Sequence, residues 1–414
     1  MKNVDFLIIG GSAAGTTAAE VIRSLKPNSS ITIVTDEDHE EYSRVLLPHY
    51  IRGKVSRSQV FLKEPGWYVQ KNIVLLKGNR VKSLEASQKI VNLDNGEQIE
   101  YGKLLIAIGG KVIKLNVPGS VLANILYMRT VEDADRIVKV ASQSQRGIVI
   151  GGGFIGLEFA SCFKANGVDE VTVLVMEDYY WQWKLDRDSG TVLQKTLEKN
   201  GVKVLTNQEI DHFEGESKVD ALMTKSGSRF KTDVVGIGIG IKSDFGWLDG
   251  TGIKINRAII TNEYLETNLP DVYAAGDCAE FWDVIFGRQH IMGNWANATS
   301  QGLAVAKTMT GERTIFETAS SYSINFVNGS CSFIGVTDEE FADEVVSRGS
   351  VEVGKMTRIF VKTIDGVVRV VGATVINNPA EVSPLTSAVK NKVDVSAYKD
   401  KLSNSSFDLK KLIG

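Results

Sequence analysis

The chain has 414 residues, of which 43% are hydrophobic and 23% are charged, and its formal net charge is -3. This length suits two or three globular domains, and the near-neutral charge argues against a nucleic-acid binder, which would usually be basic. The N-terminus lacks the pattern of a signal peptide, and no apolar run is long enough to cross a membrane. We therefore expect a protein of the cytoplasm without membrane segments.

The first predicted elements are a short buried strand at residues 4–9 and a helix that follows a glycine-rich turn. The pattern G-x-G-x-x-G is filled here by Gly10, Ser12 and Gly15, so serine replaces the middle glycine. Small residues on the first helical turn, including Ala14, let the backbone approach a pyrophosphate, which the free N–H groups and the helix dipole attract. This pattern predicts a dinucleotide site, with an ordinary glycine-rich turn as the alternative.

Charged residues after the second strand, which we expect at residues 31–34, extend this site. Asp36 follows the last glycine by about 20 residues, where a carboxylate can hold a ribose hydroxyl. Arg44 lies in the next loop between Tyr42 and an apolar segment, and an arginine there can pair with phosphates. Further strands are expected at residues 73–84, 89–93 and 103–108.

The opening pattern returns at residues 147–158, GIVIGGGFIGLE, as a complete copy. Its glycine positions are Gly151, Gly153 and Gly156. A helix through about residue 166 and a strand at 170–175 follow, so this copy also has a strand–helix–strand setting. Two such copies in one chain indicate two dinucleotide sites far more specifically than either copy alone.

The choice between NAD and NADP depends on the residues that follow this strand. By the spacing of the first copy, the acidic position falls on Met176, and Glu177 comes next. Glu177 could reach a ribose 2′-hydroxyl and favour NAD, or it could be an exposed acid at a loop tip. Lys184 and Arg187 lie downstream and could instead meet a 2′-phosphate. A glycine-broken strand at residues 234–241 is expected to close this domain.

Two later segments place polar or aromatic residues at the ends of expected elements. The strand VYAAGDC ends in Gly276 and Asp277, and a carboxylate there can point at a ligand hydroxyl or cap the next helix. The segment NWANATSQG at residues 294–302 begins a helix with Trp295 on its first turn, which could also be a core tryptophan.

Residues beyond about 316 show no glycine fingerprint, which predicts a third unit. Their alternating pattern predicts strands at 323–326, 332–336, 358–363 and 367–376 and one helix near 382–391. The three cysteines, Cys162, Cys278 and Cys331, are far apart and form neither a local redox pair nor a metal knuckle. The four histidines also lack ligand spacing, so no metal site is predicted.

Taken in order, these segments resemble the two-dinucleotide-domain flavoprotein family, which includes glutathione reductase, NADH oxidase, rubredoxin reductase and ferredoxin reductases. In that family the first fingerprint binds FAD and the inserted second one binds NAD(P)H. The resemblance implies an α/β fold with two Rossmann-like dinucleotide-binding domains and a C-terminal α/β domain. The implied boundaries are 1–112 with 252–315 for FAD, 113–251 for NAD(P)H, and 316–414 for the C-terminal domain.

The resemblance also implies which residues contact each cofactor. The implied FAD contacts are Gly10, Ser12, Gly15, Asp36, Arg44, Gly109, Arg129, Gly276, Asp277, Trp295 and Ala296. The implied nicotinamide-nucleotide contacts are Gly151, Gly153, Gly156 and Gly240. Glu158 is expected to orient the nicotinamide, and His49 stands about where ferredoxin reductases often have a lysine beside flavin N5.

The implied reaction is hydride transfer from NADH, with NADPH less favoured, to FAD, which then serves a small iron–sulfur protein or rubredoxin. The alternatives are an NADH oxidase that reduces dioxygen, a coenzyme A disulfide or persulfide reductase, and an FAD-bearing interaction protein with slow turnover. Val45 stands near the position of the single redox cysteine in some branches, which argues against cysteine chemistry. The third domain could dock the acceptor or form a homodimer.

Overall fold

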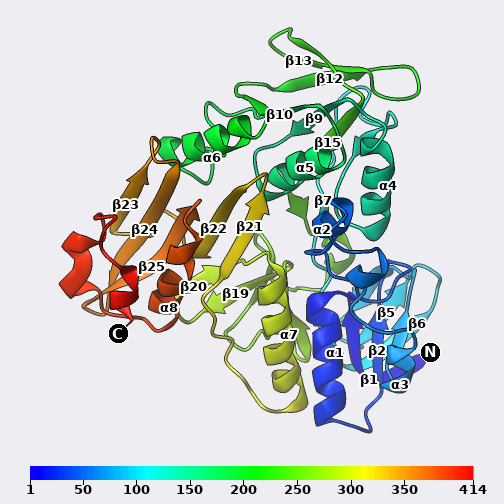
Figure 1. Ribbon diagram of the computed structural model, residues 1–414. Coiled ribbons are helices and arrows are strands. Elements are labelled where there is room, and N and C mark those ends of the chain that lie inside the picture. The colour runs from blue at the N-terminus through cyan, green and yellow to red at the C-terminus, as the bar shows by residue number, and fades with distance from the viewer. Residues whose placement is uncertain (414) are drawn as a thin grey trace. The chain divides into compact units, whose positions relative to one another are not determined.

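The computed structural model describes residues 1–413, which form two compact units (Figure 1). The first unit combines Met1–Val45, Ser56–Lys111 and Ile241–Thr318. The second unit combines Leu46–Val55, Val112–Gly240 and the chain from Ala319 onward. Each unit is therefore built from segments that are far apart in the chain. The division into three domains, with the boundaries given above, stays a prediction.

The first unit is built on a mixed sheet with the strand order β3-β2-β1-β6-β5-β4, in which β18 also pairs with β6. The strands are β1 (Lys2–Ile9), β2 (Ile31–Val34), β3 (Val74–Leu76), β4 (Val81–Glu85), β5 (Ile90–Leu93), β6 (Gln98–Ile106) and β18 (Val272–Ala274). β1 pairs in parallel with β2 and β6, and all four residues of β2 are buried. Continuous apolar runs of this kind are typical of parallel strands that are covered on both faces.

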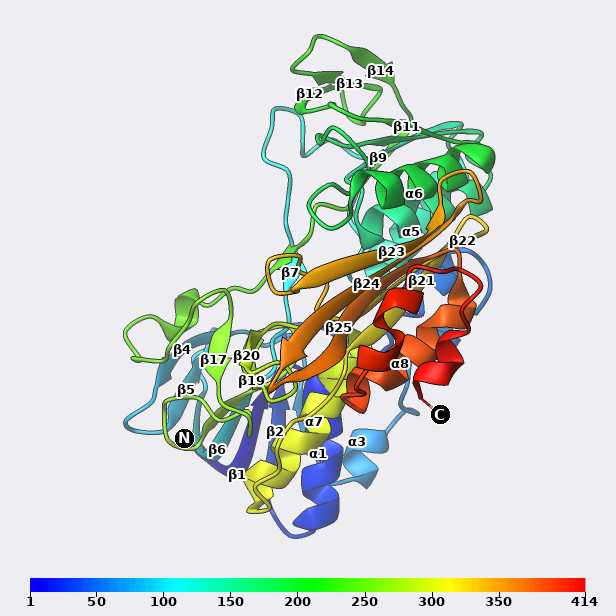
Figure 2. The same cartoon turned by 90° about the vertical axis from the view of Figure 1, so that its left-hand side faces the viewer.

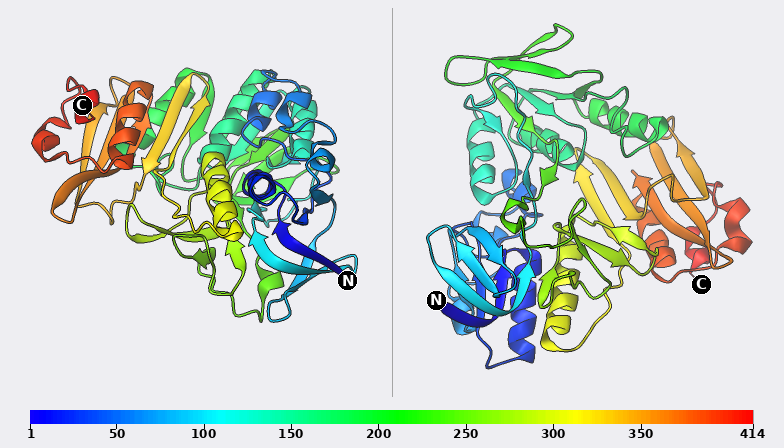
Figure 3. Two further views of the ribbon diagram at one scale, coloured as in Figure 1. Left: turned by 90° about the horizontal axis from the view of Figure 1, so that it is seen from below. Right: turned by 180° about the vertical axis from the view of Figure 1, so that it is seen from behind.

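Two helices of the first unit, α1 (Ala13–Leu25) and α7 (Trp295–Thr310), pack against each other (Figures 1 and 3). Gly302 permits this close approach, because a Cβ there would come within 2.5 Å of the Ala14 carbonyl oxygen. The remaining elements are α3 (Trp67–Gln70) and a small sheet of β17 (Ile259–Thr261), β19 (Ala279–Asp283) and β20 (Arg288–His290). The helix that follows the first dinucleotide turn, α1, thus packs against both α7 and the strands β1 and β2.

The second unit contains a parallel sheet in the order β11-β10-β9-β15-β8. Its strands are β8 (Ile125–Leu126), β9 (Arg146–Ile150), β10 (Glu170–Leu174), β11 (Val202–Leu205) and β15 (Val234–Ile237). Its helices are α2 (Leu47–Ile51), α4 (Val131–Ala141), α5 (Phe154–Ala165) and α6 (Arg187–Lys199). A three-stranded antiparallel sheet adds β12 (Ile210–Glu214), β13 (Ala221–Thr224) and β14 (Arg229–Lys231).

The C-terminal part of the second unit is a five-stranded antiparallel sheet in the order β21-β22-β25-β24-β23, with α8 beside it (Figure 2). Its elements are β21 (Ser321–Phe326), β22 (Gly329–Gly335), β23 (Glu344–Ser350), β24 (Lys355–Ile364), β25 (Val367–Ile376) and α8 (Val382–Lys390). The sequence predicted these elements except β23. Two very short strands, β7 (Lys111–Val112) and β16 (Ile241–Lys242), lie where the chain passes from one unit to the other.

Candidate functional site

The two glycine-rich turns, one in each unit, have the same backbone geometry. The first glycines, Gly10 and Gly151, have φ values of 112° and 104°, a region that side chains other than glycine rarely adopt. A Cβ on Gly10 would collide with the Ala107 carbonyl, and one on Gly151 would come within 2.5 Å of the Gly238 oxygen. Backbone conformation and space therefore both require glycine at these positions.

The third glycines, Gly15 and Gly156, allow the helix to start directly against the turn. A Cβ on Gly15 would collide with the Gly10 carbonyl oxygen, and one on Gly156 with that of Gly151. Neither α1 nor α5 has an acidic residue in its first turn, and no N-cap side chain forms a capping hydrogen bond to either helix. The first N–H groups of both helices are thus suited to an anion such as a pyrophosphate.

The middle positions, Ser12 and Gly153, are where the two turns differ in sequence. Both residues are extended, with φ and ψ of -106° and -160° for Ser12 and of -79° and -168° for Gly153. A Cβ on Gly153 would meet only Trp183 at 3.8 Å and Trp181 at 4.0 Å, which are ordinary contacts. The protein itself therefore has room for a side chain here, and the serine of the first copy does not disturb the turn.

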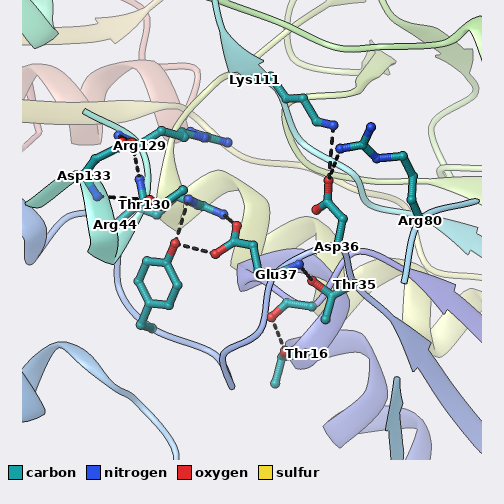
Figure 4. Close-up of polar contacts among 12 residues, drawn as sticks. Thr16, Thr35, Asp36, Glu37, Arg44, Arg80, Lys111, Arg129, Thr130 and Asp133 are labelled. Atoms are coloured by element: carbon teal, nitrogen blue, oxygen red, sulfur yellow. Dashed lines mark hydrogen bonds and ion pairs between the residues drawn. The ribbon is translucent and has the colours of Figure 1, made fainter. Parts of the chain in front are cut away.

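Asp36 follows β2 and faces two cations, as Figure 4 shows. Its Oδ2 atom is 3.1 Å from Lys111 Nζ and 3.6 Å from Arg80 Nη2. These side chains are 41–64% exposed, so the ion pairs contribute little to stability. All three border a cavity of about 130 Å³ that also reaches Gly10 and Gly109. The cavity thus joins the first turn to the acid that was expected to hold a ribose, and sequence reasoning did not single out its two cations.

Arg44 is held by Glu37 and Tyr42 (Figure 4). Its Nη2 pairs with Glu37, its Nη1 donates a 3.1 Å hydrogen bond to Tyr42, and the Tyr42 hydroxyl donates to Glu37 at 2.5 Å. Burial lowers the pKa of Arg44, but Tyr42, Glu37 and Asp277 outweigh burial and raise it. Arg44, Tyr42 and Glu37 border a cavity of about 50 Å³ beside Ser12. Arg44 is therefore charged and held in place. Its partner Glu37 was not predicted from the sequence, because it is one of several acids in a polar loop.

Gly276 and Asp277 follow β18, next to the start of α1. Gly276 has a φ of 82°, and a Cβ there would lie 3.5 Å from the Ala14 side chain. The Gly276 N–H donates a 2.6 Å hydrogen bond to Gln301 on α7, and Asp277 is one of the groups that raise the pKa of Arg44. The first turn of α7 carries Trp295, which is half-buried, and Ala296, which is exposed. The first unit thus brings two of the residues that were expected to contact FAD, Ala14 and Gly276, next to each other.

Two residues that were expected beside FAD, His49 and Arg129, belong to the second unit. His49 lies in α2, and its pKa is lowered by burial and by the charges of Arg52 and Lys54. Arg129 precedes α4, and its backbone N–H donates a 2.9 Å hydrogen bond to the Asp133 carboxylate. Figure 4 shows this contact at the capping box of the helix. The roles of both residues toward FAD stay predictions.

Glu158 lies on α5, just after the third glycine of the second turn. Its side chain is 17% exposed, and its Oε2 atom is buried without accepting a hydrogen bond. Arg52 Nη1 lies 3.5 Å from that oxygen. Burial raises the pKa of Glu158 to about 7, although Arg52 and Lys54 lower it. A carboxyl group that titrates near neutral pH beside a dinucleotide turn is typical of a functional group.

The segment after β10 lies against the second turn. Glu177 is half-buried, and its carbonyl accepts a 3.0 Å hydrogen bond from Asn207. Trp181 is 1% exposed and has a φ of 60°, whereas Trp183 is 67% exposed, and their rings approach each other edge to face. Sequence reasoning missed both tryptophans, because only the fold brings them to Gly153. Gly240, the remaining expected contact, is exposed and has a φ of 108°.

All three cysteines are free and fully buried, at 0% exposure. Burial raises the pKa of Cys278 to about 12 and moves those of Cys162 and Cys331 higher still. A thiol must ionise to act as a nucleophile, so these environments oppose redox chemistry. Val45, at the position of the redox cysteine in other branches, is 55% exposed.

We therefore expect no cysteine to take part in turnover. A Cys162→Ser, Cys278→Ser, Cys331→Ser triple variant should keep the wild-type rate of flavin reduction, and two electrons per FAD should complete the reduction without a thiolate–flavin charge-transfer band. Anaerobic titration followed by absorbance checks this. A requirement for four electrons per FAD, or loss of turnover in Cys278→Ser while FAD stays bound, would revive a disulfide or persulfide reductase.

Within residues 1–413, no helix is both long enough and apolar enough to span a bilayer. The same residues contain no cluster of three or more histidine, cysteine, aspartate or glutamate side chains that could hold a metal ion.

Comparison with known proteins identifies relatives of the chain. The profile of the family "Pyridine nucleotide-disulphide oxidoreductase" matches residues 4–302. The chain is 28% identical over 397 residues to nitrite reductase [NAD(P)H] of Bacillus subtilis (strain 168), covering 96% of this chain but 48% of that protein. It thus spans about half the length of this relative. It is also 28% identical to the biphenyl dioxygenase system ferredoxin--NAD(+) reductase component of Paraburkholderia xenovorans (strain LB400), covering 94% of each.

Among solved structures, the chain is similar to the reductase in the covalent putidaredoxin reductase–putidaredoxin complex. The TM-score is 0.91 at 25% identity, and the match covers 100% of this chain and 99% of that one. The resemblance inferred from the sequence and the predicted α/β fold are both confirmed by these matches. The chain belongs to the pyridine nucleotide-disulphide oxidoreductase family.

Proposed function

We propose that this chain passes electrons from NADH through FAD to a small iron–sulfur protein or rubredoxin. The pair of matching glycine turns supports this proposal most. In each turn a pyrophosphate can approach the backbone closely and accept hydrogen bonds from the uncapped N–H groups of the following helix. We assign FAD to the turn at Gly10 and NADH to the turn at Gly151. The ferredoxin and putidaredoxin reductases among the relatives support an iron–sulfur acceptor.

When bound, the nicotinamide supplies a hydride to the flavin, which can release electrons singly. The chain supplies positions and charges. In the FAD site, Asp36 would hold a ribose and Arg44 would balance phosphate charge. Glu158 would accept a hydrogen bond from the carboxamide group of the nicotinamide ring. None of these tasks needs a thiol, and the burial of all three cysteines argues against the coenzyme A disulfide and persulfide alternatives.

Anaerobic rapid mixing of the FAD-loaded protein with NADH tests the proposal. We expect the flavin to bleach in milliseconds to seconds and then to reoxidise rapidly when an oxidised ferredoxin or rubredoxin is added. Reoxidation by dioxygen in parallel samples is the control. Faster reoxidation by dioxygen than by either protein would make the chain an NADH oxidase. Bleaching over minutes or longer would indicate an FAD-bearing interaction protein.

We further expect NADH to be preferred over NADPH because of Glu177. A carboxylate near the ribose would repel a 2′-phosphate, and the two downstream cations are engaged elsewhere: Lys184 lies over the Phe333 ring and Arg187 over the Tyr179 ring. Glu177→Ala should therefore reduce the NADH/NADPH ratio of kcat/KM by about tenfold, equivalent to about 1.4 kcal/mol. The exposed acid Asp178 is the matched control, as Asp178→Ala. An unchanged ratio in Glu177→Ala would make Glu177 a loop acid.

The cellular location and the activity of the whole protein are also part of this proposal. We place the reaction in the cytoplasm, where thiols stay reduced, because all three buried cysteines are unpaired. The nitrite reductase is about twice as long as this chain, so it contains further segments besides the part that matches. The activity of the whole protein to which this chain belongs is therefore part of the proposal.

A further inference from the structure

Arg52 is a buried cation to which no sequence motif pointed. It follows α2, its side chain is 8% exposed, and its guanidinium lies 3.5 Å from the Glu158 carboxylate. Its Nε donates a 3.1 Å hydrogen bond to the Pro48 carbonyl, and its Nη1 donates a 3.2 Å bond to the Asn325 carbonyl on β21. The guanidinium is thus fixed by two backbone carbonyls from two different segments, so its position beside Glu158 does not depend on the carboxylate.

The segment that carries Arg52 is itself attached to the helix of Glu158. Asn166, at the end of α5, donates a 2.8 Å hydrogen bond to the Ile51 carbonyl. Cys162, one turn after Glu158, places its sulfur 3.8 Å from the Pro48 carbonyl. These contacts hold α2 against α5, so the spacing between Arg52 and Glu158 is part of the framework.

The geometry of the pair leaves Glu158 with unused bonding capacity. At 3.5 Å Arg52 acts on the carboxylate by charge, while Glu158 Oε2 accepts no hydrogen bond although it is buried. A buried acceptor without a hydrogen-bond partner is costly, and the nearby positive charge of Arg52 offsets part of this cost. Arg52 is therefore the charge partner of the buried oxygen, and the Glu158 side chain keeps 17% of its surface exposed, through which another group can reach it.

We propose that Arg52 is a positioning residue for nicotinamide recognition, whose charge favours the ionised form of Glu158 so that its carboxylate accepts a hydrogen bond from the carboxamide N–H. This inference rests on the proposed function, because it takes the second turn as the NADH site. An ionised acceptor forms a stronger hydrogen bond than a neutral one, so the charge of Glu158 decides how tightly the carboxamide is held.

The groups around Glu158 set the expected pH dependence. α2, which packs against α5, and the turn after it carry His49, Arg52 and Lys54, and of these Arg52 and Lys54 act on Glu158. Cys162 lies on α5 itself. β21, which packs against α5, carries Tyr322, whose ring contacts Phe154 and whose burial raises its pKa further above its ordinary value. Burial raises the pKa of Glu158 to about 7, and the charge of Arg52 opposes this rise more strongly than that of Lys54. Below that pH the carboxyl gains a proton, so carboxamide binding should weaken as the pH falls through 7 and strengthen as it rises.

The test uses the FAD-loaded protein and two unreactive nucleotides. Tetrahydro-NAD carries the carboxamide on a neutral ring and cannot donate a hydride, and ADP-ribose lacks the nicotinamide. Calorimetry gives both affinities from about pH 6 to about pH 9, across the range where the carboxylate titrates. The ¹³C resonance of the Glu158 carboxyl, assigned by its loss in Glu158→Gln, gives the pKa directly.

In Arg52→Gln we expect the Glu158 pKa and the midpoint of tetrahydro-NAD binding to rise together by about one unit, because an opposite charge has been removed. At pH 7 this variant should bind tetrahydro-NAD about fivefold more weakly, converge with wild type at high pH, and bind ADP-ribose normally. Arg52→Lys keeps the charge and should stay near wild type. Lys54→Gln, at an exposed site, should shift the midpoint less in the same direction. Glu158→Gln should show no pH dependence.

A loss in Arg52→Gln that is equal for both nucleotides at every pH, or an unmoved Glu158 pKa, would overturn the inference and make Arg52 a structural anchor. If the glutamine variant does not fold, Arg52→Met, which keeps the length of the aliphatic stem, provides the same comparison. A wild-type protein that binds neither nucleotide, or whose FAD is not reduced by NADH, would instead contradict the proposed function. The two failures are therefore distinguishable.

Discussion

Gly15→Ala should yield a protein that has lost tight FAD binding, whereas Gly156→Ala should keep FAD and lose affinity for NADH. In each case the new methyl group collides with a backbone carbonyl of its own turn, Gly10 in one and Gly151 in the other. A backbone carbonyl cannot move aside as a flexible side chain can, so the helix must shift away from the turn to make room for the methyl group. Overpacking of this kind costs about 1–3 kcal/mol, and we expect the affected cofactor to bind about 5- to 150-fold more weakly.

The ratio of flavin absorbance to protein after gel filtration measures FAD retention, and calorimetry with ADP-ribose measures the second site. Gly153→Ser is the matched control, because a Cβ at Gly153 meets only ordinary contacts and serine already occupies this position in the first turn. It should fold with wild-type stability. Loss of FAD in Gly156→Ala with retention in Gly15→Ala would reverse our assignment of the two turns.

Asp277→Ala should weaken FAD binding by about 10- to 150-fold, which corresponds to about 1.5–3 kcal/mol for a charged hydrogen-bond acceptor. Asp277 follows Gly276 at the end of β18, its Oδ1 would lie 3.8 Å from a Cβ on Gly293, and its charge acts on Arg44. The family resemblance assigns this carboxylate to the ribityl hydroxyls. Removing it would leave those hydroxyls without a charged acceptor.

Equilibrium dialysis or fluorescence titration of the apoprotein with FAD gives the two dissociation constants. Asp277→Asn keeps the shape and one acceptor oxygen but loses the charge, so it should fall between wild type and alanine. Thermal unfolding of the apoproteins separates a general loss of stability from a loss of binding. An Asp277→Ala protein that retains stoichiometric, equally tight FAD would remove Asp277 from the site.

The sequence by itself determined the two dinucleotide turns and the elements around them. Their constraints are local, because the atom that forbids a side chain at Gly15 belongs to Gly10, a few positions earlier, and the same holds for Gly156 and Gly151. Steric rules that act within one turn leave a pattern in consecutive residues. For the same reason the expected helix starts and the apolar strands could be placed without coordinates.

One strand escaped prediction because a buried charge interrupts its pattern. β23 contains Arg348, which is 4% exposed and lies 3.1 Å from Glu381. Its guanidinium also donates hydrogen bonds to the carbonyls of Ser405 and Phe407. Arginine in a strand normally indicates an exposed face, and only its partners, which come from later segments, explain its burial.

The tertiary structure alone decided how charges meet in the candidate sites. Glu37 is one acid among several in a polar loop until folding places it against Arg44, and Lys111 comes to Asp36 from another strand end. Arg52 and Glu158 are likewise distant in the chain. Electrostatic pairing acts through space between groups that no short pattern connects, and burial, which moves the pKa of Glu158 toward neutrality, is a property of the assembled fold.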